Sequence, residues 1–241
     1  MRILVISDIH ANLTALVAVL ADSGEVDGVW CLGDLVGYGP DPEECVTRVR
    51  NLPNLVCLLG NHDVAVMGKL DMEAFNREAN LSVNWTRENL SAASLFFFQS
   101  LTTRVETMGV TLSHGSPRNP IWEYLLDLNT VLTNFSFFRT KICLVGHTHI
   151  PILYSHNGNG SVDWSVPQPG TPLIIKGRAI LNPGSVGQPR DRDPRAAYAI
   201  FTPEESKWEP RRVAYDVAAV HERIKAAGLP QRHATRLIDG W

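Results

Sequence analysis

Aspartate and histidine recur in five short motifs, most of which contain glycine, and an apolar segment precedes each motif. Imidazole, carboxylate and amide groups in such a set bind manganese, iron, zinc or cobalt, and no cysteine accompanies them as in a structural zinc site. Five of the eight histidines of the chain fall within these motifs. The motifs are Asp8-Ile9-His10, Gly33-Asp34, Gly60-Asn61-His62-Asp63, Ser113-His114-Gly115 and Gly146-His147-Thr148-His149.

The motifs differ in how strongly each indicates function. The first two are weak by themselves, because strand ends and turns commonly carry the same residues. The third is more specific, and the last is stronger still, because two imidazoles within four residues are hard to explain structurally. Their joint occurrence favours a functional metal site over a set of ordinary core or surface histidines.

The strands and helices that position these motifs follow from the hydrophobic pattern. Nearly continuous apolar runs at 2–7, 28–32 and 55–59 predict parallel strands that are buried on both faces. Apolar residues at helical spacing predict helices at about 12–21 and 42–50 between those strands. The carboxyl ends of neighbouring strands in an open α/β sheet border one crevice, so motifs that are distant in sequence converge there.

The remainder of the chain predicts two helical regions and a second sheet. A helical insertion is expected at about 71–101, and its aromatic residues either stack on a substrate or form the insertion's own small core. A helical tail is expected at about 216–241, with an amphipathic helix from about Val217 to Ala227. Further strands are expected at 110–113 and 142–146, followed by a second, largely antiparallel sheet from residues 152–155, 162–166, 173–176, 179–182 and 196–201.

The ordered motifs resemble those of the calcineurin-like metallophosphoesterase superfamily, in particular its compact bacterial and archaeal members, over residues 1 to about 200. The resemblance extends to residues 35–42 and to Asn182-Pro183-Gly184-Ser185, while Ser113 stands where many members have glycine. It implies an α/β fold in which two mixed β-sheets pack as a sandwich with helices on the outer faces, in four α-β-β-α layers. It also implies that residues 1–241 form a single domain.

The same resemblance implies two divalent transition-metal ions, with manganese foremost and iron, zinc, cobalt or nickel as alternatives. Asp34 would serve both ions, and a bridging carboxylate suits ions about 3.5 to 4 Å apart. A hydroxide that bridges the ions would attack the phosphorus of the substrate. One ion would be held by Asp8, His10, Asp34 and His149, and the other by Asp34, Asn61, His114 and His147.

The third motif also offers candidates for proton transfer and for contact with substrate. In the family pattern the histidine at the position of His62 approaches the leaving-group oxygen, and imidazole can donate a proton near neutral pH. Asp63 either orients His62 or caps the turn that follows. Further candidates for binding the phosphate are Asn61 and the loop arginines Arg118, Arg190 and Arg192.

Composition restricts the class of protein. With 241 residues, 44% of them hydrophobic, and a formal net charge of −3, the chain has the character of a globular enzyme. The charge gives no support for broad binding to nucleic acid or to an anionic membrane. No secretory signal or membrane span is recognised, so a cytoplasmic protein is expected. Four cysteines are expected as buried, reduced thiols: Cys31, Cys45, Cys57 and Cys143.

The predicted function is hydrolysis of a small organic phosphate, either a phosphodiester or a phosphomonoester. A dinucleoside polyphosphate hydrolase and a protein phosphatase are the alternatives within this class. A non-catalytic metal-binding scaffold is the alternative outside it, although a scaffold has no need of a proton donor such as His62. The sequence does not indicate an oligomeric state.

Overall fold

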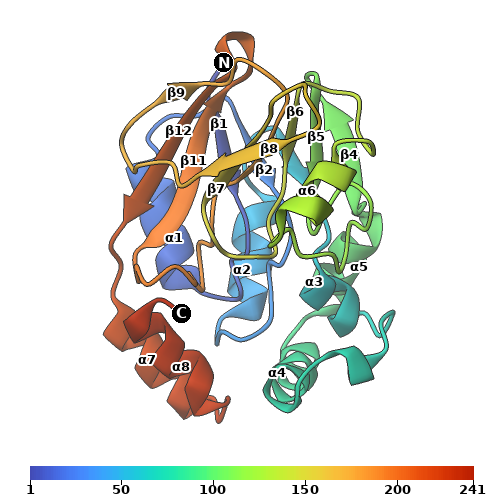
Figure 1. Cartoon of the computed structure of the whole chain (residues 1–241). Helices are drawn as coiled ribbons and strands as arrows, with labels where there is room; N and C mark the ends of the chain where they lie inside the picture. Colours follow the sequence, from blue (N-terminus) through green and yellow to red (C-terminus); the bar gives the residue numbers. More distant parts are fainter.

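Two six-stranded β-sheets form the centre of the computed structural model, which describes residues 1–241 (Figure 1). Along the first sheet lie β3 (Leu55–Cys57), β2 (Gly28–Cys31), β1 (Ile3–Ile6), β11 (Ala196–Thr202), β12 (Lys207–Val213) and β9 (Leu173–Ile174). Along the second sheet lie β4 (Arg104–Thr107), β5 (Val110–Ser113), β6 (Ile142–Leu144), β10 (Ala179–Asn182), β7 (Ile152–His156) and β8 (Val162–Ser165).

Both sheets are mixed, as the family resemblance implies. In the first sheet β1, β2 and β3 are parallel, and β11, β12 and β9 extend them as antiparallel strands. In the second sheet β5, β6 and β10 are parallel, and antiparallel strands lie on both sides of them. The expected sandwich of two mixed sheets is therefore confirmed.

The assignment of strands to sheets differs from the prediction. Strands β11 and β9, which were expected in the second sheet, lie in the first, whereas β5 and β6 lie in the second. Strand β11 pairs with β1 from Ile3 opposite Phe201 to Val5 opposite Ala199, and nearly all of it is buried. Because a strand that is apolar on both faces has no pattern specific to either sheet, the sequence could not identify its neighbour.

Side-chain alternation explains why the first strand is apolar throughout. Ile3 and Val5 pack in the core between the two sheets, together with residues of the second sheet such as Leu144. Leu4 and Ile6 point to the opposite face and pack in a core that includes the helices. Each of these side chains contributes about 1.5–3 kcal/mol through burial, so both faces of β1 require apolar residues.

Helices cover the outer faces of the sandwich and its lower end (Figure 1). α1 contacts the first sheet and α2, α2 contacts α5, and α6 lies against β8 of the second sheet. Asn12 caps α1 by accepting a hydrogen bond from the N–H of Ala15. The helices are α1 (Leu13–Asp22), α2 (Pro42–Arg50), α3 (Asn61–Val66), α4 (Arg77–Glu88), α5 (Ala92–Ser100), α6 (Leu128–Asn134), α7 (Val217–Ala226) and α8 (Gln231–Asp239), with short 3₁₀ turns at Met72–Ala74 and Pro203–Glu205.

Residues 71–101 are helical, as expected, but they do not form a core of their own. Phe75, Val83 and Phe98 are buried in the same core as the helix-facing residues of β1. Trp85 packs instead on the cluster formed by α7 and α8. Aromatic residues of this region therefore join it to the rest of the molecule.

Two helices form the C-terminal tail, of which the hydrophobic pattern identified only the first. α7 and α8 pack on one another through Val220, Ile224, Leu229 and Leu237. They lie with α3 and α4 at the lower end of the sandwich (Figure 1). No helix is both long enough and apolar enough to cross a membrane. The four cysteines are buried and unpaired, as expected.

Candidate metal centre

The five motifs meet at one end of the sandwich, although they come from different sheets. β1, β2 and β3 of the first sheet lead into the first three motifs, whereas β5 and β6 of the second sheet lead into the others. The expectation of a crevice at the edge of a single open sheet was therefore wrong. The motifs converge because the packed sheets present the ends of these strands in the same direction.

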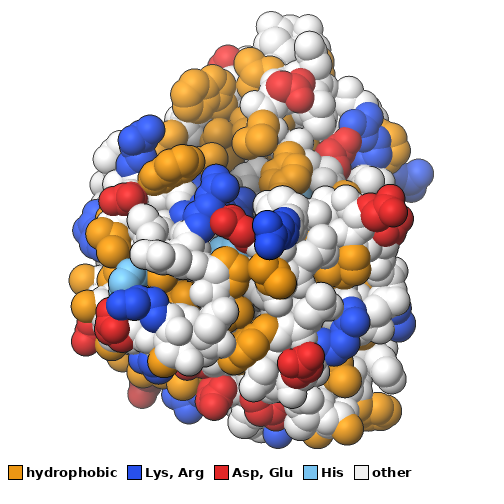
Figure 2. Space-filling model, turned by 90° about the horizontal axis from the view of Figure 1, so that it is seen from below, with side chains coloured by type: hydrophobic (Ala, Val, Ile, Leu, Met, Phe, Trp, Pro, Cys, Tyr) orange, Lys and Arg blue, Asp and Glu red, His pale blue; other side chains and the backbone are white.

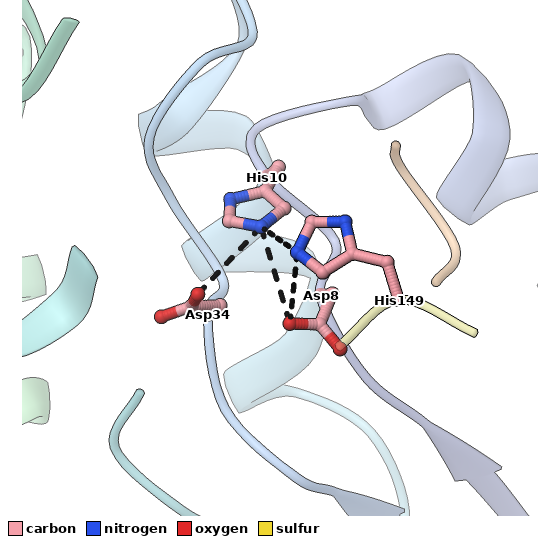
Figure 3. A group of neighbouring side chains, drawn as sticks. All are labelled: Asp8, His10, Asp34 and His149. Atoms are coloured by element: carbon pink, nitrogen blue, oxygen red, sulfur yellow. Dashed lines mark hydrogen bonds and ion pairs between the residues drawn. The ribbon is translucent and has the colours of Figure 1, made fainter. Parts of the chain in front are cut away.

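Four side chains form a first cluster, and their potential ligand atoms all lie within 4.8 Å of one another. Figure 3 shows Asp8, His10, Asp34 and His149 directed toward a common point. The Nε2 atoms of His10 and His149 are 3.1 Å apart, and His149 Nε2 lies 3.4 Å from Asp8 Oδ1. His10 Nε2 lies 3.6 Å from Asp34 Oδ2. Exposure of all four side chains is 2% or less.

A second cluster shares Asp34 with the first and adds His114 and His147. His114 Nε2 lies 3.5 Å from Asp34 Oδ2 and 3.3 Å from Asn61 Oδ1, so the amide is close to this group. His147 Nε2 is buried without a hydrogen-bond partner. All seven predicted ligands thus come together around Asp34, which is the residue expected to serve both ions.

Backbone carbonyl groups fix the orientation of three imidazoles. The Nδ1 atoms of His10, His114 and His149 lie 3.0, 2.9 and 2.6 Å from the carbonyl oxygens of Val36, Leu32 and Gln188. A carbonyl oxygen only accepts, so each Nδ1 carries a proton and Nε2 is the atom of each ring that faces the cluster. Carbonyl contacts of this kind are a common support of histidine ligands in metal sites.

The backbone at the ligands is held in left-handed conformations. Asp8, His10, Asp34, His147 and His149 have φ values of 53°, 48°, 54°, 65° and 60°. Residues other than glycine adopt such values at a cost of about 1–3 kcal/mol, although Asp and His tolerate them better than most. Hydrogen bonds from the surrounding loops offset this cost, because Asp8 N–H donates to the Gly33 carbonyl and His10 N–H to that of Asp34.

Glycine at the motifs leaves room for the ligands themselves. A Cβ atom on Gly60 would lie 2.0 Å from Asp34 Oδ1 and 2.4 Å from the Asp34 nitrogen. A Cβ atom on Gly146 would lie 2.0 Å from Ser7 Oγ and 3.0 Å from Asp8 Oδ2. The two carboxylates therefore keep their positions only because glycine stands opposite them.

Burial and charge prepare the cluster for cations. Burial lowers the pKa of His10, His147 and His149 well below the usual range, so these imidazoles are neutral. Burial disfavours ionisation of Asp34, but the charges of His114 and His62 hold its pKa well below the usual value. Burial opposes protonation of His114, yet the Asp34 charge raises its pKa to about 9.

The donor set fits divalent transition-metal ions. With both Nδ1 atoms protonated, the lone pairs of His10 Nε2 and His149 Nε2 face one another at 3.1 Å, which is repulsive unless a cation lies between them. In the second cluster, the Nε2 atom of His147 has no hydrogen-bond partner and the carboxylate of Asp34 is shared with the first cluster. Both groups therefore offer lone pairs to a second cation. Neutral imidazoles with carboxylates and an amide suit manganese, iron, cobalt or zinc.

His62 lies beside the clusters, but Asp63 does not orient it. Asp63 accepts hydrogen bonds from the backbone N–H groups of Leu35, Val36 and Gly60, at 2.9, 3.3 and 2.9 Å. His62 Nδ1 is buried without a partner. Of the two roles expected for Asp63, the pairing with His62 is therefore wrong and the cap of the following turn is confirmed, since the two oxygens of the carboxylate cap α3 and hold the loop after β2. The role of Asp63 is to position the backbone around Asp34.

The three candidate arginines have different surroundings. Arg118 pairs with the carboxylate of Glu123, which neutralises its guanidinium, so it is not available as a phosphate clamp in this arrangement. Arg190 lies over the ring of Tyr38, at 5.9 Å, and its charge lowers the pKa of several ligands. Arg192 donates its backbone N–H to the Gly240 carbonyl at 2.7 Å. Arg190 is thus the predicted arginine that adjoins the metal centre.

Sequence reasoning did not single out two aromatic residues at the site. The Tyr38 ring lies 4.4 Å from that of His62 and 4.6 Å from that of His10. Tyr124 stacks on His147 with ring centroids 3.8 Å apart and remains 42% exposed. Tyr38 stands between two glycines in residues 35–42, a segment that resembles the family, so the sequence did contain an indication of Tyr38. Exposed stacking surface beside the cluster thus comes from Tyr124, whereas Phe75 of the helical region is buried against His62.

Comparison with known proteins agrees with this geometry. The model of the calcineurin-like phosphoesterase superfamily domain matches residues 1–206. A metallophosphoesterase of known crystal structure from Sphaerobacter thermophilus is 46% identical, with a TM-score of 0.91 over 100% of this chain and 99% of that chain. An uncharacterized protein from Methanocaldococcus jannaschii is 39% identical over 99% of this chain and 98% of its own length.

A more distant similarity covers only part of the chain. A symmetrical bis(5′-nucleosyl)-tetraphosphatase from Pectobacterium carotovorum is 39% identical over 66 residues, which are 26% of this chain and 24% of that protein. The family match, by contrast, spans the strands and loops that carry every candidate ligand. The chain therefore belongs to the calcineurin-like phosphoesterase superfamily.

Proposed function

We propose that this chain hydrolyses a small organic phosphate ester with two divalent transition-metal ions, manganese foremost. The observation that carries this proposal is the position of Asp34, which belongs to both groups of ligand atoms. One carboxylate that serves two ions is the arrangement of two-metal hydrolytic sites. A non-catalytic scaffold would not require two adjacent groups or a histidine such as His62 beside them.

The bound ions would supply Lewis acidity, which activates water and offsets charge on the phosphoryl oxygens. Residues of the chain would hold and orient the reactants. Asp8, His10, Asp34 and His149 would hold one ion, and Asp34, Asn61, His114 and His147 the other. Arg190 would contact a phosphoryl group of the substrate from the side of Tyr38.

His62 is the proposed proton donor. Water attacks phosphorus and releases one proton to solvent, the ester P–O bond breaks, and His62 gives a proton to the departing oxygen, which leaves as an alcohol. Packing against Tyr38 and Phe75, at 4.4 and 5.1 Å between ring centroids, orients the imidazole. Burial lowers the pKa of His62 to about 4. The proposed role therefore requires an anionic phosphate beside the ring, because such a charge raises the pKa.

A dinucleoside polyphosphate is the second candidate substrate. The partial match to a bis(5′-nucleosyl)-tetraphosphatase supports it. Tyr124 also supports it, because an exposed ring stacked on His147 offers a surface for a nucleobase. An aryl ester would use the same surface, so direct comparison of substrates is required.

Chelation and metal replacement test the proposed function. Metal-free protein should not hydrolyse bis(nitrophenyl) phosphate, nitrophenyl phosphate, cyclic nucleotides or dinucleoside polyphosphates, and added manganese should restore turnover of at least one of them. Turnover by verified metal-free protein would contradict the metal dependence. A fully loaded protein that hydrolyses none of these esters, nor a phosphopeptide, would support the scaffold instead.

Two aspartate variants test the sharing of Asp34. Asp34→Asn should lose both ions and all turnover, because its carboxylate belongs to both groups of ligands. Asp8→Asn should mainly lose the ion bound between His10 and His149, since Asp8 belongs to the first group alone. Metal content measured by mass spectrometry separates the two outcomes. Equal metal content in the two variants would show that Asp34 does not bridge.

A further inference from the structure

The last helix of the chain, α8, packs directly against the metal centre. A small cavity of about 10 Å³ is lined by His10, Tyr38 and Gln188 on the side of the ligands and by His233 and Leu237 of α8. The rings of His233 and Tyr38 lie 4.7 Å apart, and Tyr38 lies 4.6 Å from the ligand His10. The Tyr38 ring and this small cavity therefore separate α8 from the candidate ligand His10.

Two arginines without acidic partners lie at this contact. Arg190 lies over Tyr38 and donates to Oε1 of Gln188 at 3.0 Å. Arg236 lies three residues after His233, so it projects from the same side of α8. The Nε atom of each arginine is buried without a hydrogen-bond partner, and neither guanidinium pairs with a carboxylate. Arg232 of the same helix, in contrast, pairs with Glu78 at 3.6 Å.

The charges of the two arginines act on one another and on Tyr38. Burial lowers the pKa of Arg236, the nearby charges of Arg190 and Arg232 lower it further, and Tyr38 and Glu78 oppose this shift. Burial raises the pKa of Tyr38, and Arg190 and Arg236 oppose that rise. Two guanidinium groups that repel one another and leave buried N–H groups unsatisfied are stabilised by an anion between them. Planar guanidinium groups suit phosphate oxygens in particular.

Both arginine side chains are partly exposed, so a ligand can reach them from solvent. Figure 2 views the molecule from this end and shows both basic and acidic side chains beside a partly covered histidine near the middle of the face. The N–H of Arg192 donates to the Gly240 carbonyl at 2.7 Å and so ties the Arg190 loop to the end of α8.

We propose that Arg190 and Arg236 form an anion-binding site beside the metal centre, which holds a phosphoryl group of the substrate other than the one that is hydrolysed. The inference rests on the proposed phosphoesterase function and specifies its substrates as compounds with at least two phosphoryl groups, such as phosphate esters of nucleoside polyphosphates. Arg190 lies within residues 1–206, which match the family domain, and Arg236 lies outside them, so α8 completes the site.

Binding of inorganic tripolyphosphate to the metal-free protein tests the site without any activity. Calorimetry should show binding that weakens by about tenfold or more in Arg236→Gln and in Arg190→Gln, because each removes a charge-assisted contact. Arg236→Lys should retain part of the affinity. The matched control is Arg232→Gln, which lies on the same helix and should weaken binding by about twofold or less. An equal effect of Arg232→Gln and Arg236→Gln would overturn the proposal, because general charge would then explain the binding.

Turnover by the manganese-loaded protein tests the assignment to substrate. The ratio of kcat/KM for a dinucleoside tetraphosphate to that for bis(nitrophenyl) phosphate should fall by about tenfold in Arg236→Gln. The ratio should not change in Arg232→Gln. Equal loss on both substrates would show that Arg236 only supports α8, and would overturn the inference.

The two tests also separate the possible sources of the anion. If Arg236→Gln weakened inorganic phosphate and tripolyphosphate alike and left the substrate ratio unchanged, the site would bind free phosphate and the substrate assignment would be wrong. If tripolyphosphate binding depended on both arginines but no ester were hydrolysed, the anion site would stand and the proposed function would fail. Failure of the inference is thus distinct from failure of the function.

Discussion

At the scale of single residues, protons occupy the metal centre in the absence of metal. The Asp34 charge raises the pKa of His114 to about 9, although burial opposes protonation. Burial raises the pKa of Asp8 to about 7, and the His114 charge limits the rise. Both groups must lose their protons to bind a cation. Metal affinity should consequently depend on pH over the range set by these two values.

Metal affinity is expected to rise as pH increases and to level off near pH 9. Between pH 7 and 9, filling the site displaces the His114 proton, so affinity should rise by about tenfold per pH unit. Below pH 7 Asp8 is also protonated, and the dependence should become steeper. Calorimetry in buffers of different ionisation enthalpy measures the protons released. An affinity that is constant from pH 6 to 9 would contradict the assignment of these two ligands.

The leaving group probes the role of His62. If His62 protonates the departing oxygen, His62→Gln should retain both metals and lose about 10²- to 10⁴-fold in kcat on alkyl or nucleoside esters. The loss should be much smaller on nitrophenyl esters, because nitrophenolate leaves without a proton. His221→Gln on α7 is the control for loss of a histidine outside the cluster. The same loss on every ester would instead indicate contact with phosphoryl oxygens, and loss of metal would indicate support of a ligand.

The candidate ligands could be selected from the sequence, but the pairing of side chains could not. Asp8, His10 and Asp34 were identifiable because their residue types at strand ends have few structural uses in combination. Sequence left open whether Asp63 orients His62 or caps a turn, and which of three arginines binds phosphate, because the groups that hold Asp63 and Arg118, namely backbone N–H groups and Glu123, could not be identified. Those groups lie on segments that only the folded chain brings close. The left-handed backbone conformation of five candidate ligands could not be predicted either, because only their residue types hint at it in the sequence.

At the scale of elements, the turn between β4 and β5 carries an unfavourable residue. Met108 and Gly109 connect these strands, and both have positive φ, 48° and 73°. A two-residue hairpin turn of this kind favours Asn followed by Gly, since asparagine adopts positive φ more readily than methionine. Met108 is 47% exposed, so its replacement removes little buried surface.

Met108→Asn is expected to stabilise the chain by about 1 kcal/mol and to raise Tm by about 2–4 °C. Thermal unfolding of the metal-free protein measures the effect without a contribution from bound ions. Gly109→Ala provides the opposite control and should lower Tm, because alanine is strained at positive φ. A lower Tm for Met108→Asn would mean that methionine makes contacts that outweigh its backbone strain.

Elements with a clear hydrophobic period were predicted, and those without one were missed. α2 was predicted at its observed bounds because Pro42 opens it and its apolar face is regular. β12 was missed because Pro210 and several charged residues interrupt its sequence. The proline is tolerated there because β9 pairs only with Lys207 and Trp208, so no neighbouring strand needs the missing N–H of Pro210.

At the scale of the whole molecule, the α7–α8 pair is attached to the sandwich by few polar contacts. Its apolar cluster is separate from the cores of the two sheets. Arg223 of α7 donates to both oxygens of Asp41, at 3.1 and 2.9 Å, and to Thr14 Oγ1 at 2.7 Å. These bonds join α7 to α1 and to the residue before α2. Because α8 bears Arg236, the attachment of α7 also affects the proposed anion site.

Arg223→Gln is expected to loosen the helix pair without emptying the metal centre. An exposed ion pair contributes about 0.2–1 kcal/mol, so amide hydrogen exchange in α8 should accelerate by up to about fivefold. Metal content should not change, because the candidate ligands lie on loops that follow strands of the sheets or, for Asn61, at the start of α3, and none lies on α7 or α8. Lys225→Gln is the matched control, since Lys225 pairs only with Glu222 of the same helix, at 3.3 Å. Unchanged amide exchange in α8, or faster exchange throughout the chain, would show that Arg223 does not specifically attach the helix pair. If exchange in α8 became faster and tripolyphosphate binding became weaker, the attachment of the pair would be linked to the anion site.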